Sequence, residues 1–244
     1  MFGYLKLEIL RSLRDPRYLV LALAAPVGFY ILFAGLFGGD QGAYGVTAKV
    51  DIMVSMAVYG ALWAVLQATG PRIAQDRSIG WLRQIRLLPV QSNAILVARL
   101  LSGLALALPA IVLVFITAAL THGVRLDLGQ WVSMGLLLWV GSIPLAVLGI
   151  AIGYALGAES AFGLLYGLSV VLSALGGLWM PITMFPTTLQ TIGKALPSFQ
   201  AANLGWRIVG GRAPFVSSFF YLLVWAILFA ALALYFTRRA PSTR

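Results

Sequence analysis

The sequence contains no cysteine and little charge. Only 10% of its 244 residues are charged and 61% are hydrophobic, whereas an ordinary globular domain carries roughly 25% charged residues. The absence of cysteine excludes disulfide bonds, a thiolate nucleophile and a cysteine-ligated metal. The hydrophobicity excludes an intrinsically disordered chain, because disordered chains are polar. With so few groups that can face water, the chain is expected to be an integral membrane protein.

Acidic residues and histidine are scarce as well. The chain has 7 acidic residues against 17 Lys and Arg, which gives a net charge of +10. In a soluble protein this excess would suggest nucleic acid, but here membrane topology explains it better, and we expect no nucleic-acid partner. The single histidine, His122, has no cluster of possible ligands beside it, and the pattern G-x-x-x-x-G-K-[ST] is missing. We therefore expect no metal, cofactor or catalytic residue in this chain.

Six stretches without Asp, Glu, Lys or Arg are long enough to form transmembrane helices. A helix needs about 20 mostly apolar residues to cross about 30 Å of hydrocarbon. We predict an all-α integral membrane protein with a single transmembrane domain over residues 1–244. Prolines are expected to kink three of the spans, and glycines spaced by four to allow close helix packing in the fourth. The predicted spans are approximately 18–37, 52–70, 94–120, 130–156, 160–177 and 214–236, the prolines are Pro26, Pro109 and Pro144, and the glycines are Gly149, Gly153 and Gly157.

The charge-free stretch over 160–193 is too long for one helix. Its second half reads GGLWMPITMFP, and paired glycines with two prolines interrupt a helix. We predict a re-entrant segment over 178–212 on the outer side, which needs protein or a water-filled cavity to satisfy its backbone. The alternative is an interfacial loop whose short helices lie on the bilayer.

The basic residues predict the orientation. With six spans and both termini inside, 12 of the 17 basic residues are cytoplasmic, and the other five are Lys49, Arg125, Lys194, Arg207 and Arg212. Because basic residues gather on the cytoplasmic side, we predict a multi-pass protein of the cell (inner or plasma) membrane with both termini in the cytoplasm. The short loop 157–160 opposes this locally, since it should be inside but has no basic residue.

Residues 2–15 precede the first span and have an amphipathic pattern, which Pro16 ends. At about 100° per residue, one arc of this helix is apolar. We predict an interfacial helix on the inner leaflet, with its arginines near anionic lipid headgroups. The alternative is a plain basic flank that only sets topology. The apolar arc consists of Phe2, Leu5, Ile9, Leu10 and Leu13.

The cytoplasmic segment 71–93 is too polar to cross the membrane and too long for a minimal turn. Within it, apolar residues recur at helical spacing beside two arginines, and Pro89 closes the helix. Such a face can dock into a groove on a soluble partner. The alternative is that it packs on the lipid headgroups. The apolar residues are Trp81, Leu82, Ile85 and Leu88, and the arginines are Arg83 and Arg86.

The order D-R-x-x-G-W-L-R-Q-I-R-L-L-P-V over 76–90, followed by ILVARLL, resembles permeases of the type-two ABC export family, which include drug and antibiotic exporters. Residues 177–211, with paired prolines, Leu-Gln-x-Ile and Lys-x-x-Pro, are similar to that family's signature after the fifth span. The resemblance extends over essentially the whole chain. One departure is that a Glu is expected near Gln75 and Asp76, where this chain has one acid among arginines, so the polarity of the partner's groove stays open.

The resemblance implies that 76–89 is a coupling helix that contacts a separate ABC ATPase. It implies two copies of that ATPase, which hold ATP and magnesium, and a second permease that is either a copy of this chain or a relative. Membrane lipid is the remaining expected partner. The implied ATPase-coupling residues are Asp76, Arg77, Gly80, Trp81, Leu82, Arg83, Ile85, Arg86 and Pro89.

Polar and aromatic residues recur along one face of the second and fifth predicted spans. The resemblance implies that these spans line the substrate route, and the alternative is ordinary helix–helix contact. The candidate pathway residues are Ser55, Tyr59, Trp63 and Gln67 in the second span and Phe162, Tyr166, Ser169 and Ser173 in the fifth. The candidate outer-gate residues are Met180, Pro181, Phe185 and Pro186.

We therefore expect the membrane subunit of an ATP-driven exporter that moves a small amphiphilic or drug-like substrate out of the cytoplasm. The alternative is an uncoupled channel or a carrier driven by an ion gradient. The carrier is weakened because no acid falls within a predicted hydrophobic core. A purely structural membrane scaffold is the third reading.

Overall fold

The computed structural model describes residue 16 and residues 19–39, 41–42, 45–79, 92–213 and 216–239. Over these residues the chain is helical, apart from loops and one isolated bridge between Gln41 and Thr47. The helices are η1 (Leu19–Ala24, a π-helical turn), α3 (Ala25–Phe37), α4 (Ala48–Ser78), α6 (Ser92–Thr121), α7 (Leu128–Gly141), α8 (Ile143–Ala155), α9 (Ala158–Leu175), η2 (Ile182–Met184, a 3-10 turn), α10 (Thr187–Ala195), α11 (Pro197–Val209) and α12 (Val216–Arg239).

Six helical segments are long and apolar enough to cross a membrane, which confirms the predicted all-α, six-span fold. The first consists of η1 and α3, the fourth of α7 and α8, and the others of α4, α6, α9 and α12. The predicted interfacial helix over 2–15 lies outside the described residues.

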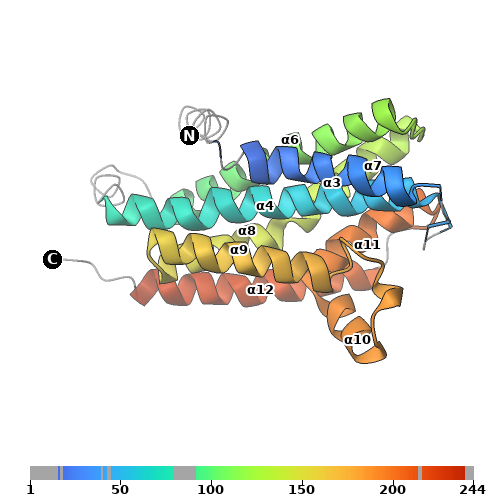
Figure 1. Cartoon of the computed structure of the whole chain (residues 1–244). Helices are drawn as coiled ribbons and strands as arrows, with labels where there is room; N and C mark the ends of the chain where they lie inside the picture. The colour runs from blue at the N-terminus through green and yellow to red at the C-terminus, as the bar shows by residue number, and fades with distance from the viewer. Residues whose placement is uncertain are drawn as a thin grey trace.

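Helix α4 lies at the centre of the bundle and packs against α3, α6, α8, α9 and α11 (Figure 1). Of the 18 residues that form its apolar stretch, 89% are buried, against 17% for α12. A helix with apolar residues all round its surface is either covered by other elements or exposed to lipid as a membrane span, and α4 is covered whereas α12 is mostly uncovered. The other spans are therefore arranged around α4, and α12 presents most of its surface outward.

Glycines bring the backbones of α4 and α8 close together. A methyl group at Gly153 would lie 2.5 Å from the Gly70 carbonyl oxygen and 2.9 Å from the Ile73 Cβ, and one at Gly149 would overlap the Thr69 side chain. The predicted close packing is confirmed for Gly149 and Gly153. It is wrong for Gly157, which has no neighbour within 4 Å of an added Cβ, because this residue lies beyond the end of α8.

Proline has different effects in the different spans. Pro144 lies in the first turn of α8, and the predicted fourth span is divided at Ser142. Pro109 and Pro71 are inside α6 and α4, which run on without a break, so α4 continues to Ser78 rather than ending near residue 70. A proline removes one backbone donor, and a packed neighbouring helix makes that tolerable in a membrane helix.

The segment between α9 and α12 folds back over the end of the bundle at which α9 ends, which is called the outer end after its predicted side of the membrane (Figure 1). It begins at Gly176 and Gly177, where Gly177 has a φ of 72° that favours glycine. Helix α11 is largely buried against α4, α7 and α12, whereas α10 projects from the bundle (Figure 1). The interruption predicted from the glycines and prolines is present, and the depth of this segment in the bilayer stays a prediction.

The α4–α8 crossing predicts that Gly153→Ala destabilises the bundle. The new methyl group meets backbone and Cβ atoms that cannot rotate away, so we expect a loss of about 1–3 kcal/mol in the free energy of unfolding. Unfolding of the detergent-solubilised chain by SDS measures it. Gly163→Ala in α9 is the matched control, because nothing lies within 4 Å of its added Cβ. Equal stability of the two variants would contradict the close approach.

Candidate functional site

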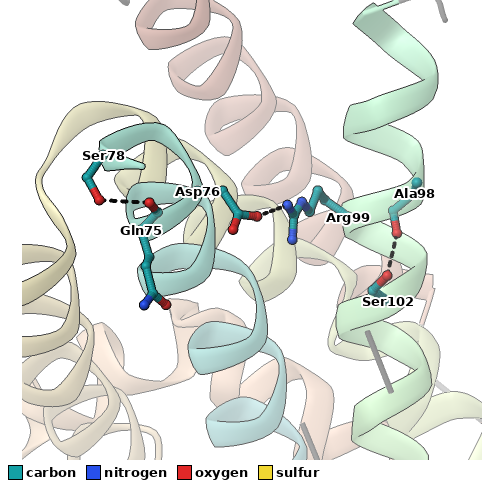
Figure 2. A network of polar contacts seen from close by, with 6 residues as sticks. All are labelled: Gln75, Asp76, Ser78, Ala98, Arg99 and Ser102. Carbon is teal, nitrogen blue, oxygen red and sulfur yellow. Dashed lines mark hydrogen bonds and ion pairs between the residues drawn. The ribbon is translucent and has the colours of Figure 1, made fainter. Parts of the chain in front are cut away.

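A buried ion pair joins α4 and α6 near the ends that the 80–91 connection links, which are called the inner ends after their predicted side of the membrane. The Arg99 guanidinium donates to the Asp76 carboxylate, and the two side chains are 1% and 4% exposed (Figure 2). Each charge costs several kcal/mol to remove from water, and mutual attraction offsets this only in good geometry. Asp76 and Arg99 are thus committed to the interior of the bundle.

The next residue along α4 contacts a third helix. Arg77 donates from Nη1 to the carbonyl oxygens of Gly153 (3.1 Å) and Tyr154 (2.5 Å), and its guanidinium lies 6.0 Å from the centre of the Tyr154 ring. These carbonyls belong to the last turn of α8, where a helix favours a positive charge. Neighbouring residues of α4 therefore hold α6 and α8 at the same level of the bundle.

Through these contacts, two of the predicted ATPase-coupling residues bind other helices of the same chain. Asp76 is buried, and Arg77 is half-buried with its guanidinium on α8. The other seven, Gly80, Trp81, Leu82, Arg83, Ile85, Arg86 and Pro89, lie outside the described residues. Contact with an ATPase stays a prediction for all nine. In the sequence, Arg99 is one of the twelve basic residues assigned to the cytoplasmic side, and its pairing with Asp76 was not predicted. The signal was present, because a lone arginine inside the predicted span 94–120 needs a partner.

The predicted pathway residues lie mainly at the interface of α4 and α9. Ser55, Tyr59, Trp63, Ser169 and Ser173 are buried, Gln67 and Phe162 are half-buried, and Tyr166 is 45% exposed. Ser55 and Ser169 donate to carbonyls one turn earlier in their own helices, at 2.9 and 2.6 Å. The alternative of helix–helix contact describes the buried members well, and lining of a route stays a prediction for the set.

Aromatic rings connect these residues to two that the sequence did not single out. Tyr59 packs against Trp63, which packs against Tyr166 with ring centres 5.2 Å apart. Phe29 of α3 and Trp179 of the outer connection both contact Tyr59. Edge and tilted contacts of this kind favour aromatic association beyond simple burial. No local pattern could have identified Phe29 or Trp179, because their link to Tyr59 depends on the fold.

Several polar side-chain atoms of the ring cluster and of the predicted pathway set are buried without a hydrogen bond to any residue that the structure describes. They include Nε1 of Trp63 and of Trp179, Nε2 of Gln67 and the hydroxyl of Ser173. Burying such groups unpaired is costly, so a partner beyond the described residues is expected. A substrate group, water or a second chain could supply it.

A cavity of about 300 Å³ lies under the outer segment. Of the predicted outer-gate residues, Met180 and Pro181 line it, and Phe185 and Pro186 do not. Two lining residues are joined by a hydrogen bond, in which Trp206 Nε1 donates to the Asp51 carbonyl (3.1 Å). Outside the lining, Ser198 Oγ of α11 donates to the Leu172 carbonyl of α9 (2.6 Å). The remaining lining includes Ser55, Trp179, Lys194, Phe199 and Asn203. Within the described part of the chain, no three His, Asp or Glu side chains are grouped to hold a metal ion.

Six apolar spans among the described residues, five of them arranged around the buried α4, define a multi-pass helical membrane protein. Residues 2–208 match the ABC-2 type transporter family, and the chain belongs to this family. It is 29% identical over 235 residues to the Bacillus subtilis (strain 168) protein named "Putative transport permease YvfS", which covers 95% of this chain and 94% of that relative. The resemblance found in the sequence is confirmed. Membership makes the chain a membrane subunit that is not itself catalytic, and it implies an ABC ATPase partner and a second permease.

The outer segment yields a prediction with a matched control. Ser198→Ala removes the hydrogen bond between α11 and α9, and we expect a loss of about 1 kcal/mol in the free energy of unfolding. Backbone amides over 178–209 should exchange hydrogen faster, as mass spectrometry would detect. Ser169→Ala is the control, since this serine is equally buried but donates to its own helix. Equal exchange in the two variants would show that the Ser198 bond does not fasten the segment.

Proposed function

We propose that the chain is the transmembrane permease subunit of an ATP-driven ABC exporter in the cell membrane. It moves a small amphiphilic or drug-like substrate out of the cytoplasm, as in drug efflux. Two ABC ATPase subunits bind ATP and magnesium, and two permeases, identical or related, form the pathway. The observation that carries the proposal is the family match over residues 2–208, which includes the predicted coupling helix 76–89.

The orientation follows from the charge distribution. Six spans put both termini on one face of the membrane, and the basic bias makes that face cytoplasmic. The 80–91 connection and the inner ends of α4 and α6 then face the ATPase, while the outer segment 178–212 covers the exit. The ion pair between Asp76 and Arg99 lies at the base of this connection, which supports a role for the connection in transmitting movement from the ATPase to α4 and α6.

The substrate class is supported by the character of the spans. Rings from α3, α4 and α9 form one cluster, with Tyr166 at its exposed edge. Described carboxylates lie at the ends of the spans, at Asp51, Asp76, Asp127 and Glu159, rather than in their middle. A surface of this kind suits an apolar or aromatic substrate better than a free ion.

ATPase docking is tested by Trp81→Asp combined with Leu82→Asp. Placing two carboxylates on the predicted apolar face should abolish co-purification of the ATPase and ATP-dependent export, because the buried contact is lost. Gln84→Asp, in the same segment but outside the apolar set, is the control and should keep both. Persistence of association and export in the double variant would contradict the assignment of 76–89 as the coupling helix.

The alternative functions are tested by transport assays with the purified chain in liposomes. Transport without ATP would favour the channel or carrier, and no transport with any partner would favour a scaffold.

Pathway lining is tested by the accessibility of single introduced thiols. Because the chain has no native cysteine, each variant carries one thiol in this chain. Tyr166→Cys should react with a hydrophilic maleimide at least about tenfold faster than Leu136→Cys, because a thiol in lipid stays protonated and unreactive. Leu136 of α7 is the control, since it is 54% exposed and far from the ring cluster in sequence. Equal slow labelling of both would show that this face of α9 meets lipid.

A further inference from the structure

The connection between α4 and α6 is closed at its base by the ion pair. Helix α4 ends at Ser78 and α6 begins at Ser92, so Asp76 lies in the last turn of one helix and Arg99 about two turns into the other. Figure 2 shows the two side chains directed toward each other between these helices. Any displacement of the connection therefore reaches the bundle next to this pair.

Stability alone does not account for a buried pair at this position. Replacing a buried ion pair by apolar residues of similar volume is often neutral or stabilising, whereas removing one partner is strongly destabilising. A pair of this kind restricts which arrangements of two helices are possible, because every other arrangement leaves a charge buried without its partner. Asp76 and Arg99 thus specify how α4 and α6 lie against each other.

Arg77 extends the constraint to α8. Its bonds to the Gly153 and Tyr154 carbonyls lie beside the place where glycines bring α4 and α8 together. Three helices are consequently joined at one level by charged or backbone-directed contacts. By contrast, Ser78 and Ser102 donate to their own helices, at Gln75 and Ala98, and join nothing (Figure 2).

We propose that Asp76 and Arg99 are positioning residues that make the inner ends of α4, α6 and α8 move as one body when the ATPase acts on the 80–91 connection. This role does not require either side chain to touch the ATPase or the substrate, because both are buried between α4 and α6. It converts a local push into a displacement of the central helix, and through α4 it reaches the outer segment. This inference rests on the proposed function.

The test follows movement at the far end of the protein in the intact transporter. Met180→Cys places a single thiol in this chain on the outer segment, where Met180 is 51% exposed. In right-side-out membrane vesicles loaded with ATP and containing the native ATPase, an impermeant maleimide reports its reactivity. In the otherwise unsubstituted chain we expect ATP to change the labelling rate by about tenfold, within the range typical of coupled sites.

Asp76→Leu combined with Arg99→Met should remove this ATP dependence. Co-purification of the ATPase and its rate of ATP hydrolysis are measured in the same vesicles, and the labelling rates are compared per bound ATPase. The reversed pair, Asp76→Arg with Arg99→Asp, should restore at least part of the ATP dependence. Ser78→Ala is the control and should behave as the unsubstituted chain. If the pair serves only stability, the folded Asp76→Leu and Arg99→Met double variant should respond to ATP as the unsubstituted chain does. That result would overturn the proposal.

Arg77→Met provides a second measurement if the double variant is not recovered from membranes. It leaves the ion pair intact but releases α8, and we expect a reduced ATP response. An unchanged response would overturn the three-helix assignment. Failure of the unsubstituted chain to bind an ATPase, or to respond to ATP while bound to it, would instead count against the proposed function. Failure of the proposed function and failure of the ion-pair inference therefore give different results.

Discussion

Close contact between α4 and α8 is the constraint on which the rest of the bundle depends. In lipid, apolar side chains gain little by leaving one apolar surrounding for another, so helices associate through tight packing and polar contacts. Gly149 and Gly153 supply the tight packing by letting α8 approach the backbone of α4 near Gly70. With that face covered, α3, α6, α9 and α11 cover the remaining faces of α4. The central helix consequently determines where the inner and outer functional regions lie.

The bundle is held by a different kind of contact at each level. At the inner end, Asp76 and Arg77 fix α4 to α6 and α8 with charge. In the middle, aromatic rings of α3, α4 and α9 pack against one another. At the outer end, donors such as Trp206 and Ser198 bond to backbone carbonyls of other helices. Under the proposed function, movement imposed by an ATPase would enter where the contacts tolerate the least rearrangement.

Span count and fold class could be predicted because crossing a bilayer imposes a length and excludes charge, and both are visible in the sequence. Pairing could not, since Asp76 and Arg99 meet only after α4 and α6 pack. The break at Ser142 was not predicted because Pro144 can either kink or divide a helix, depending on its neighbours. Likewise, the spacing of Ser55 and Tyr59 is the same whether a helix face lines a route or packs against α9. Helix spacing identifies a face but does not specify what covers it.

Because the hydroxyls of Ser55 and Ser169 return to their own helices, sliding α9 along α4 would leave them satisfied. Rings can also exchange neighbours at low cost, while the charged inner end cannot. Helix α4 therefore has the geometry of a lever with its pivot near Asp76. From Asp76 to Ala48, α4 rises by about 42 Å, so a tilt of about 10° at the pivot displaces the outer end by about 7 Å. That is wider than a water molecule and comparable to the width of a small organic ring system.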